Sequence, residues 1–179
     1  MKIYTKMGDS GDTRLFNGAK VRKYDGRVKA YGDIDELNSF IGAAASFLKD
    51  TALASMLADV QKDLFSVGAQ LADPGFKNQA RAKFQLSHER VEALEHAIDS
   101  FETELPPLRQ FILAGGGNSG ALLHVARTVC RRAERRVVSL SQRVEVNSMV
   151  IEYLNRLSDF LFVMARVVNH REGKEEILW

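Results

Sequence analysis

Residues 147–169, NSMVIEYLNRLSDFLFVMARVVN, decide the fold of this chain. Their apolar side chains recur every three or four positions, which is the period of one face of an α-helix. This stripe consists of Val150, Ile151, Leu154, Leu157, Leu161, Met164 and Val168. Residues 119–140, SGALLHVARTVCRRAERRVVSL, show the same period. We therefore predict two long amphipathic helices that bury their apolar faces in a common core.

Three further stretches with helical periodicity lie upstream, at residues 34–48, 53–71 and 87–101. Asp33 is expected to cap the first of them, and residues 73–75 (Asp-Pro-Gly) to end the second. Short loops between helices favour antiparallel neighbours. The sequence thus predicts an all-α, five-helix bundle that forms one domain over residues 1–179.

The composition narrows the class of protein. The net charge of +2 is too balanced for a protein that coats nucleic acid, and no stretch approaches 18 apolar residues, so no membrane span is expected. The single cysteine, Cys130, excludes an internal disulfide and is interpreted as a small buried residue. The lone cysteine and the lack of a signal peptide suggest a cytoplasmic location.

Residues 1–30 form a glycine-rich arm with loop composition. Within it, residues 5–13 (TKMGDSGDT) combine exposed backbone N–H groups, hydroxyls and a lysine, which suit a polyphosphate. The motif is not a Walker A loop, because no Gly-Lys-Ser/Thr follows at the required spacing. A flexible polar arm would have the same composition, so both interpretations stay open.

An arginine-rich face follows in the stretch 119–140. Arg127, Arg131, Glu134 and Arg135 fall at i, i+4, i+7 and i+8, so they share one side of the expected helix. Several arginines on one face repel one another unless an anion neutralises their charge. Guanidinium groups bind phosphate oxygens through two parallel hydrogen bonds. The alternative is an exposed face paired with acids of neighbouring helices.

Other polar positions allow two interpretations each. Asn155 and Asp159 lie one turn apart among inward-facing apolar residues, where Asn155 could meet a ligand or form a helix–helix hydrogen bond. The acids of residues 31–38 (YGDIDELN) would suit the positive end of a helix dipole, although Asp35 could instead reach Arg127.

Residues 111–119, FILAGGGNS, lead an apolar segment into glycines and a helix start. This segment could be a mobile wall over a ligand, or it could pack on the core. The four histidines are scattered without metal-ligand spacing, so no protein-held metal site is predicted.

Together these motifs resemble the propanediol-utilisation type of ATP:cob(I)alamin adenosyltransferase. The resemblance spans nearly the whole chain. It rests on the motifs that stand here at residues 3–13, 23–28, 31–42, 111–116, 126–135 and 153–159.

The resemblance implies a homotrimer of five-helix bundles with active sites between subunits. It also implies transfer of the 5′-deoxyadenosyl group of ATP to the cobalt of cob(I)alamin, with Mg²⁺ accompanying ATP, triphosphate as the leaving group and coenzyme B12 as the product. Cob(I)alamin is itself the nucleophile, so the protein supplies binding and orientation.

The resemblance also assigns residues. The arm residues that it places at the ATP of one subunit are Thr5, Lys6, Met7, Gly8, Thr13, Arg14 and Lys23. The helix residues that it places at the same nucleotide from the neighbour are Arg131, Arg132, Glu134, Arg135 and Asn155. Arg127 is expected to pair with Asp35, and Phe111 to help remove the lower axial ligand of cobalt. Ala114 stands where many members of the family have proline. This difference affects the stiffness of the loop on the cobalamin side.

Three other functions remain as alternatives at this point. A helical-bundle binding protein would sense ATP or cobalamin without turnover, or would deliver the product to a client enzyme. A structural helical oligomer would not bind ATP, and a small-molecule kinase would release ADP. An adenosyltransferase would also need a reductase to supply cob(I)alamin and a B12-dependent client enzyme to use the product.

Overall fold

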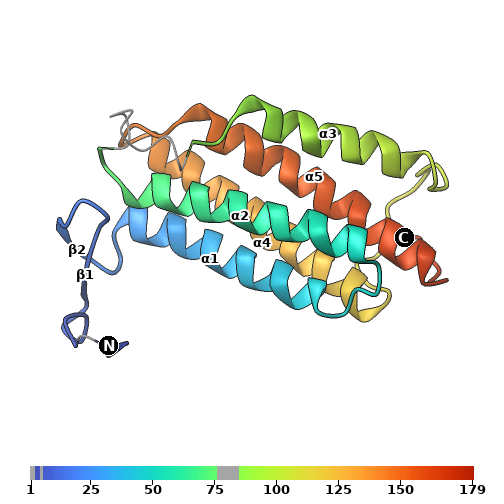
Figure 1. Ribbon diagram of the computed structural model, residues 1–179, viewed down its shortest axis with the longest axis horizontal. Helices are drawn as coiled ribbons and strands as arrows, with labels where there is room; N and C mark the ends of the chain where they lie inside the picture. Colours follow the sequence, from blue (N-terminus) through green and yellow to red (C-terminus); the bar gives the residue numbers. More distant parts are fainter. Residues whose placement is uncertain (1–2, 5, 76–84) are drawn as a thin grey trace.

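Five α-helices form the body of the computed structural model, which describes residues 3–4, 6–75 and 85–179. The helices are α1 (Gly26–Ala45), α2 (Thr51–Ala72), α3 (His88–Glu102), α4 (Asn118–Ser141) and α5 (Ser148–Arg171). Helix α1 packs against α2 and α4, and α5 packs against α3 and α4 (Figure 1). The prediction of an all-α, five-helix bundle is confirmed.

The core consists of the apolar stripes that the sequence indicates. Leu37, Leu64, Leu123, Leu154 and Leu157 come from four helices, and each is at most 1% exposed. Full burial of one leucine side chain contributes about 1.5–3 kcal/mol, so the shared core accounts for the packing of the helices.

Helix α1 begins earlier than the sequence suggested. Asp25 caps it, and its Oδ1 accepts a hydrogen bond from Arg27 N at 2.8 Å. The buried Ala30 extends the apolar stripe toward this start. The prediction that Asp33 caps the helix is wrong, and the acids of residues 33–36 lie in its interior rather than in its first turn. Gly26 and Gly32 gave this region a loop-like composition, although glycine inside a helix costs only about 1 kcal/mol.

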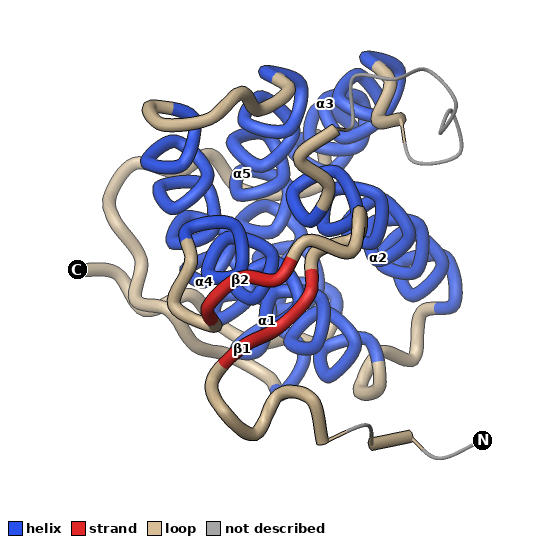
Figure 2. The backbone as a smooth tube through the Cα atoms, turned by 90° about the vertical axis from the view of Figure 1, so that its left-hand side faces the viewer, coloured by secondary structure: helices blue, strands red, loops and turns tan. Residues whose placement is uncertain are grey.

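The N-terminal arm is not entirely loop. Strand β1 (Asp12–Arg14) pairs antiparallel with β2 (Lys20–Arg22), with Thr13 opposite Val21. Leu15 N donates to Ala19 O at 2.9 Å and closes the turn. The hairpin lies beyond the end of the bundle at which α1 begins (Figures 1 and 2). Its residues are therefore displayed outside the helical core.

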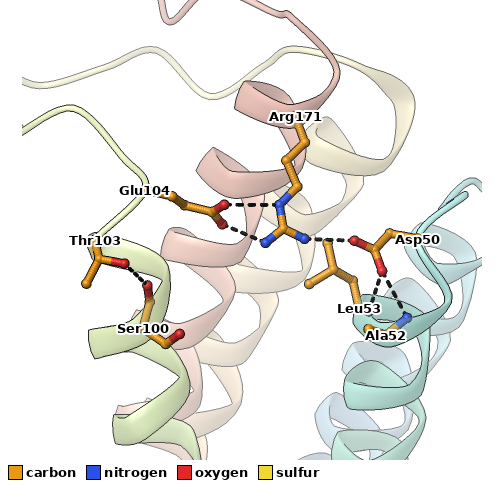
Figure 3. Close-up of polar contacts among 7 residues, drawn as sticks. All are labelled: Asp50, Ala52, Leu53, Ser100, Thr103, Glu104 and Arg171. Atoms are coloured by element: carbon orange, nitrogen blue, oxygen red, sulfur yellow. Dashed lines mark hydrogen bonds and ion pairs between the residues drawn. The ribbon is translucent and has the colours of Figure 1, made fainter.

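An ion-pair network fastens the opposite end of the bundle (Figure 3). Arg171, the last residue of α5, reaches Asp50 Oδ2 at 2.7 Å and Glu104 Oε1 at 2.8 Å. Asp50 also caps α2, because its Oδ1 accepts from Ala52 N and Leu53 N. These contacts, led by the hydrogen bond from Leu53, lower the pKa of Asp50.

Cys130 is buried, as the sequence predicted, and its thiol lies 3.2 Å from Leu154 O as a hydrogen-bond donor. Burial raises the pKa of this thiol, so it stays protonated and is not a nucleophile. In the part of the chain that the structure describes, no helix is both long and apolar enough to cross a membrane.

Candidate active site

The arm forms one cavity of about 530 Å³. It is lined by Met7, Gly8, Asp12, Thr13, Arg14, Lys20 and Lys23. Five of these were assigned to ATP from the sequence, and the hairpin brings them together. Lys6 is exposed on the same arm but does not line the cavity. Thr5 lies outside the described residues.

Positive charge dominates the arm cavity. Asp12 is the one acid in its lining, and it pairs with Lys20 at 2.8 Å and Arg22 at 3.0 Å, contacts that lower its pKa, with the Lys20 hydrogen bond first. Within the described residues, Lys23 has no acidic partner. A Cβ at Gly8 would lie 3.2 Å from Lys23 Nζ, so glycine allows the ammonium to approach the backbone. The free lysine beside backbone N–H groups suits an anionic ligand.

Helices α4 and α5 form a second cavity, of about 450 Å³. It is lined by Arg131, Glu134, Arg135, Val138, Ser139, Gln142 and Asn155. Asn155 is exposed rather than inward-facing, and its Nδ2 donates to Glu134 Oε1 at 3.1 Å. Sequence reasoning missed Ser139 and Gln142, although Ser139 follows Arg135 by one turn on the same face.

Four of the arginines of α4 divide into two groups. Arg132 pairs with Glu36 and lies 3.7 Å from Asp33 Oδ1, and Arg136 lies 3.5 Å from Asp33 Oδ2. These two arginines therefore face acids of α1, and Arg132 lines neither cavity. Arg131 and Arg135 are exposed and have no acidic partner among the residues that the structure describes. Within the described residues, the alternative of ion pairs with neighbouring helices thus holds for Arg132 and Arg136 but not for Arg131 and Arg135.

Arg127 and Asp35 do not meet within one chain. The Arg127 guanidinium lies over the Phe162 ring, 5.9 Å from its centroid, and its buried Nε has no acceptor among the described residues. Burial lowers the pKa of Arg127, and nearby Arg131 lowers it further. Asp35 is exposed, and its side chain has no cationic partner in residues 3–4, 6–75 and 85–179.

Phe111 belongs to neither cavity. Its ring is 76% exposed and meets Trp179 edge-on, with ring centroids 6.3 Å apart. Residues 111–113 pair with residues near the end of the chain through an antiparallel bridge between Ile112 and Leu178. No pattern in the sequence indicated this contact, because a single bridge has no periodicity.

Within one chain the two cavities share no lining residue. In the described part of the chain, no cluster of three or more His, Cys, Asp or Glu residues is placed to hold a metal ion. What the geometry offers instead is two separate cationic surfaces, each suited to part of a polyphosphate.

Comparisons with known proteins agree with this geometry. A family model described as cobalamin adenosyltransferase matches residues 3–168. A corrinoid adenosyltransferase of Bacillus subtilis is 47% identical over 177 residues, covering 97% of this chain and 89% of that protein. The corrinoid adenosyltransferase MMAB of Bos taurus is 43% identical over 185 residues, covering 99% of this chain and 76% of that protein.

Solved structures are also similar. A variant of the PduO-type ATP:corrinoid adenosyltransferase from Lactobacillus reuteri, complexed with cobalamin and ATP, superposes with a TM-score of 0.93 at 38% identity, covering 99% of this chain and 96% of that one. With helices, motifs and relatives in agreement over nearly all of its length, this chain belongs to the cobalamin adenosyltransferase family.

Proposed function

We propose that this chain transfers the 5′-deoxyadenosyl group of ATP to the cobalt of cob(I)alamin, forming adenosylcobalamin and releasing triphosphate. The observation that carries this proposal is the pair Arg131 and Arg135, exposed in one cavity and without acidic partners among the described residues. Unpaired guanidinium groups suit a triphosphate, and the relatives are named for this transfer to a corrinoid.

The chemistry requires little from the protein beyond binding. The electron pair of Co(I) forms the Co–C bond to C5′, and the bond between C5′ and the phosphate oxygen breaks. The triphosphate leaves with the electron pair of the broken C5′–O bond, so its negative charge grows. Arg131 and Arg135 from α4, with Lys23 from the arm, are proposed to stabilise this charge. Holding C5′ in line with cobalt lowers the rest of the barrier, because the reacting atoms are already close together and aligned.

The arm of one copy is proposed to complete the helix cavity of another. Both cavities are cationic, yet they share no lining residue within a chain, and a head-to-tail ring would bring them together. Asp35 is exposed, and Arg127 Nε has no acceptor in the part of the chain that the structure describes. These two residues are proposed to form an ion pair across the same interface. A homotrimer is the assembly that the family resemblance implies.

Further assignments complete the proposal. Phe111 is proposed to face the corrinoid and to help remove the lower axial ligand of cobalt, since its side chain is exposed rather than buried. Loss of that ligand leaves four-coordinate cob(II)alamin, which is easier to reduce. Mg²⁺ is proposed to arrive on the ATP phosphates, because this ion prefers phosphate oxygens and water with few protein carboxylates. Glu134 is the one carboxylate among the described residues that line the α4–α5 cavity.

The reaction is proposed to depend on two partner enzymes and on a reducing compartment. A reductase must supply cob(I)alamin, and a B12-dependent client enzyme uses the product. Both the low-valent cobalt and the free Cys130 suit the reducing cytoplasm. The chain binds no nucleic acid in this proposal, because its charge is nearly balanced.

An anaerobic assay with ATP, Mg²⁺ and chemically reduced cobalamin tests the function. The cobalt spectrum and the phosphate product are followed together. Adenosylcobalamin with equal triphosphate supports the proposal, whereas ADP would indicate a kinase. Binding of ATP without turnover would indicate a sensor or carrier, and no binding would indicate a structural oligomer.

A further inference from the structure

Residues 106–117 make up most of the connection between α3 and α4 and carry Phe111 near their middle. Although the Phe111 ring is 76% exposed, the segment around it is held by contacts at both ends and in the centre. An exposed aromatic ring adds little to the stability of an isolated chain. The contacts that hold it therefore call for another explanation.

Arg166 of α5 holds the first end of the segment. Its side chain is 5% exposed, and its Nη2 donates to Pro106 O at 2.9 Å. The same guanidinium donates from Nε to Glu176 Oε1 at 2.6 Å and from Nη2 to Glu176 Oε2 at 3.2 Å. The planar fork of arginine thus joins residue 106 to the segment that follows α5, which a lysine could not do in the same geometry.

Asn169, one turn further along α5, holds the second end. Its Oδ1 accepts from Gly117 N at 3.0 Å, and its Nδ2 donates to Gly115 O at 2.9 Å. A Cβ at Gly116 would lie 2.1 Å from Asn169 Oδ1, and Gly116 has a φ of +107°. Both the space and the backbone conformation therefore require glycine between the two hydrogen bonds.

Residues 174–179 hold the centre of the segment. Leu113 N donates to Ile177 O at 2.8 Å, and Trp179 N donates to Phe111 O at 2.9 Å. The Trp179 ring meets the edge of Phe111. Because Glu176 lies within this stretch, the ion pair with Arg166 fixes the strand-like pairing as well as the first end.

We propose that Arg166 and Asn169 are positioning residues, which hold residues 106–117 and 174–179 so that the Phe111 ring is presented to the corrinoid in one orientation. The two side chains lie three residues apart on one face of α5, so a single rigid helix sets both anchors. A largely buried ion pair is costly to desolvate, so stability alone does not explain why one holds the segment of an exposed ring. A need to keep the Phe111 ring in one orientation does explain it. The proposal rests on the proposed role of Phe111.

Glu176→Ala is the sharpest test, because Glu176 is the more exposed partner of the pair and lies outside the helices. Thermal unfolding checks that the bundle stays folded, since the variant leaves the Arg166 guanidinium without its ion-pair partner. Glu175→Ala is the matched control, since it removes the same charge from the adjacent exposed residue, which has no side-chain partner among the described residues. Trp179 is the only tryptophan, so its fluorescence anisotropy reports the mobility of residues 174–179 directly.

We expect Glu176→Ala to lower the Trp179 anisotropy, to reduce the four-coordinate cob(II)alamin signal, and to lower kcat by about 10- to 100-fold with an unchanged KM for ATP. Glu175→Ala should match the unmodified protein in all three. Unchanged anisotropy in Glu176→Ala would show that the ion pair does not hold the segment. Lower anisotropy with normal cob(II)alamin signal and kcat would show that the held segment does not position Phe111.

The two proposals fail in different ways. If Phe111→Ala leaves the cob(II)alamin spectrum unchanged, the role of Phe111 is wrong, whatever the anisotropy shows. If Phe111→Ala abolishes the four-coordinate signal while Glu176→Ala leaves it intact, the role of Phe111 stands and the positioning role is overturned.

Discussion

Complementation between two weakened variants would show whether the two cavities meet between copies. Lys23→Ala removes the free ammonium of the arm cavity, and Arg131→Ala removes a guanidinium of the α4–α5 cavity. A charge-assisted contact to phosphate contributes about 1.5–3 kcal/mol, so each variant should lose roughly 10- to 150-fold in kcat/KM for ATP.

The recovery on mixing follows from the geometry. Each proposed site takes its arm from one copy and its helices from the neighbour. An intact site forms wherever an Arg131→Ala copy gives its arm to a Lys23→Ala copy. In randomly assorted rings made from equal amounts, half of the arms and half of the helix cavities are intact, so about a quarter of the sites are active.

The assay is triphosphate release by a co-expressed mixture, with subunit mixing measured by native mass spectrometry. Arg136→Ala is the matched control on the same helix, because Arg136 faces Asp33 of α1 and lies outside the cavity. It should leave the KM for ATP nearly unchanged. Activity that stays at the level of the single variants, with mixed oligomers present, would refute a site shared between copies.

Three further predictions concern other parts of the molecule. Phe111→Ala should leave ATP binding largely intact but slow formation of four-coordinate cob(II)alamin, which electron paramagnetic resonance would detect; an unaltered spectrum would contradict the assignment. Asp35→Arg should weaken the oligomer and Arg127→Asp in the same chain should restore it, as light scattering would show; a double variant no better than the single one would exclude the pair. The pKa of Asp50 is lowered in the folded state, so its stabilisation is present above the ordinary value of 3.8 and is lost as pH falls through the lower folded value. Asp50→Asn keeps a good helix cap but should reduce this acid-dependent loss, and urea unfolding at about pH 5 and about pH 2.5 would measure the difference.

Much of the helical architecture could be predicted because it depends on local repetition. The apolar stripes of α2, α4 and α5 have the helical period, and removing them from water leaves few alternatives to a bundle. The start of α1 was mistaken because two aspartates, Asp25 and Asp33, can each cap a helix. Only the burial of Ala30 and the hydrogen bond from Arg27 N select the first.

The arm shows a different limit. Its hairpin has strands of only three residues, and Thr13 pairs with Val21 through backbone hydrogen bonds that polar and apolar residues form equally well. The composition therefore indicated an anion-binding loop but not the hairpin that gathers Gly8, Thr13 and Lys23 around one cavity.

The sequence by itself determined the helices, the arginine-rich face and the motifs of the family, because each of these is a local pattern of residue types. Tertiary structure alone decided which arginines of α4 pair with acids. The acids of α1 contact Arg132 and Arg136, while Arg131 and Arg135 line the cavity beside Asn155. It also decided that Arg166 and Asn169 hold the segment of Phe111. These contacts join residues far apart in the chain, and their partners are chosen by how the helices pack rather than by any spacing along the sequence.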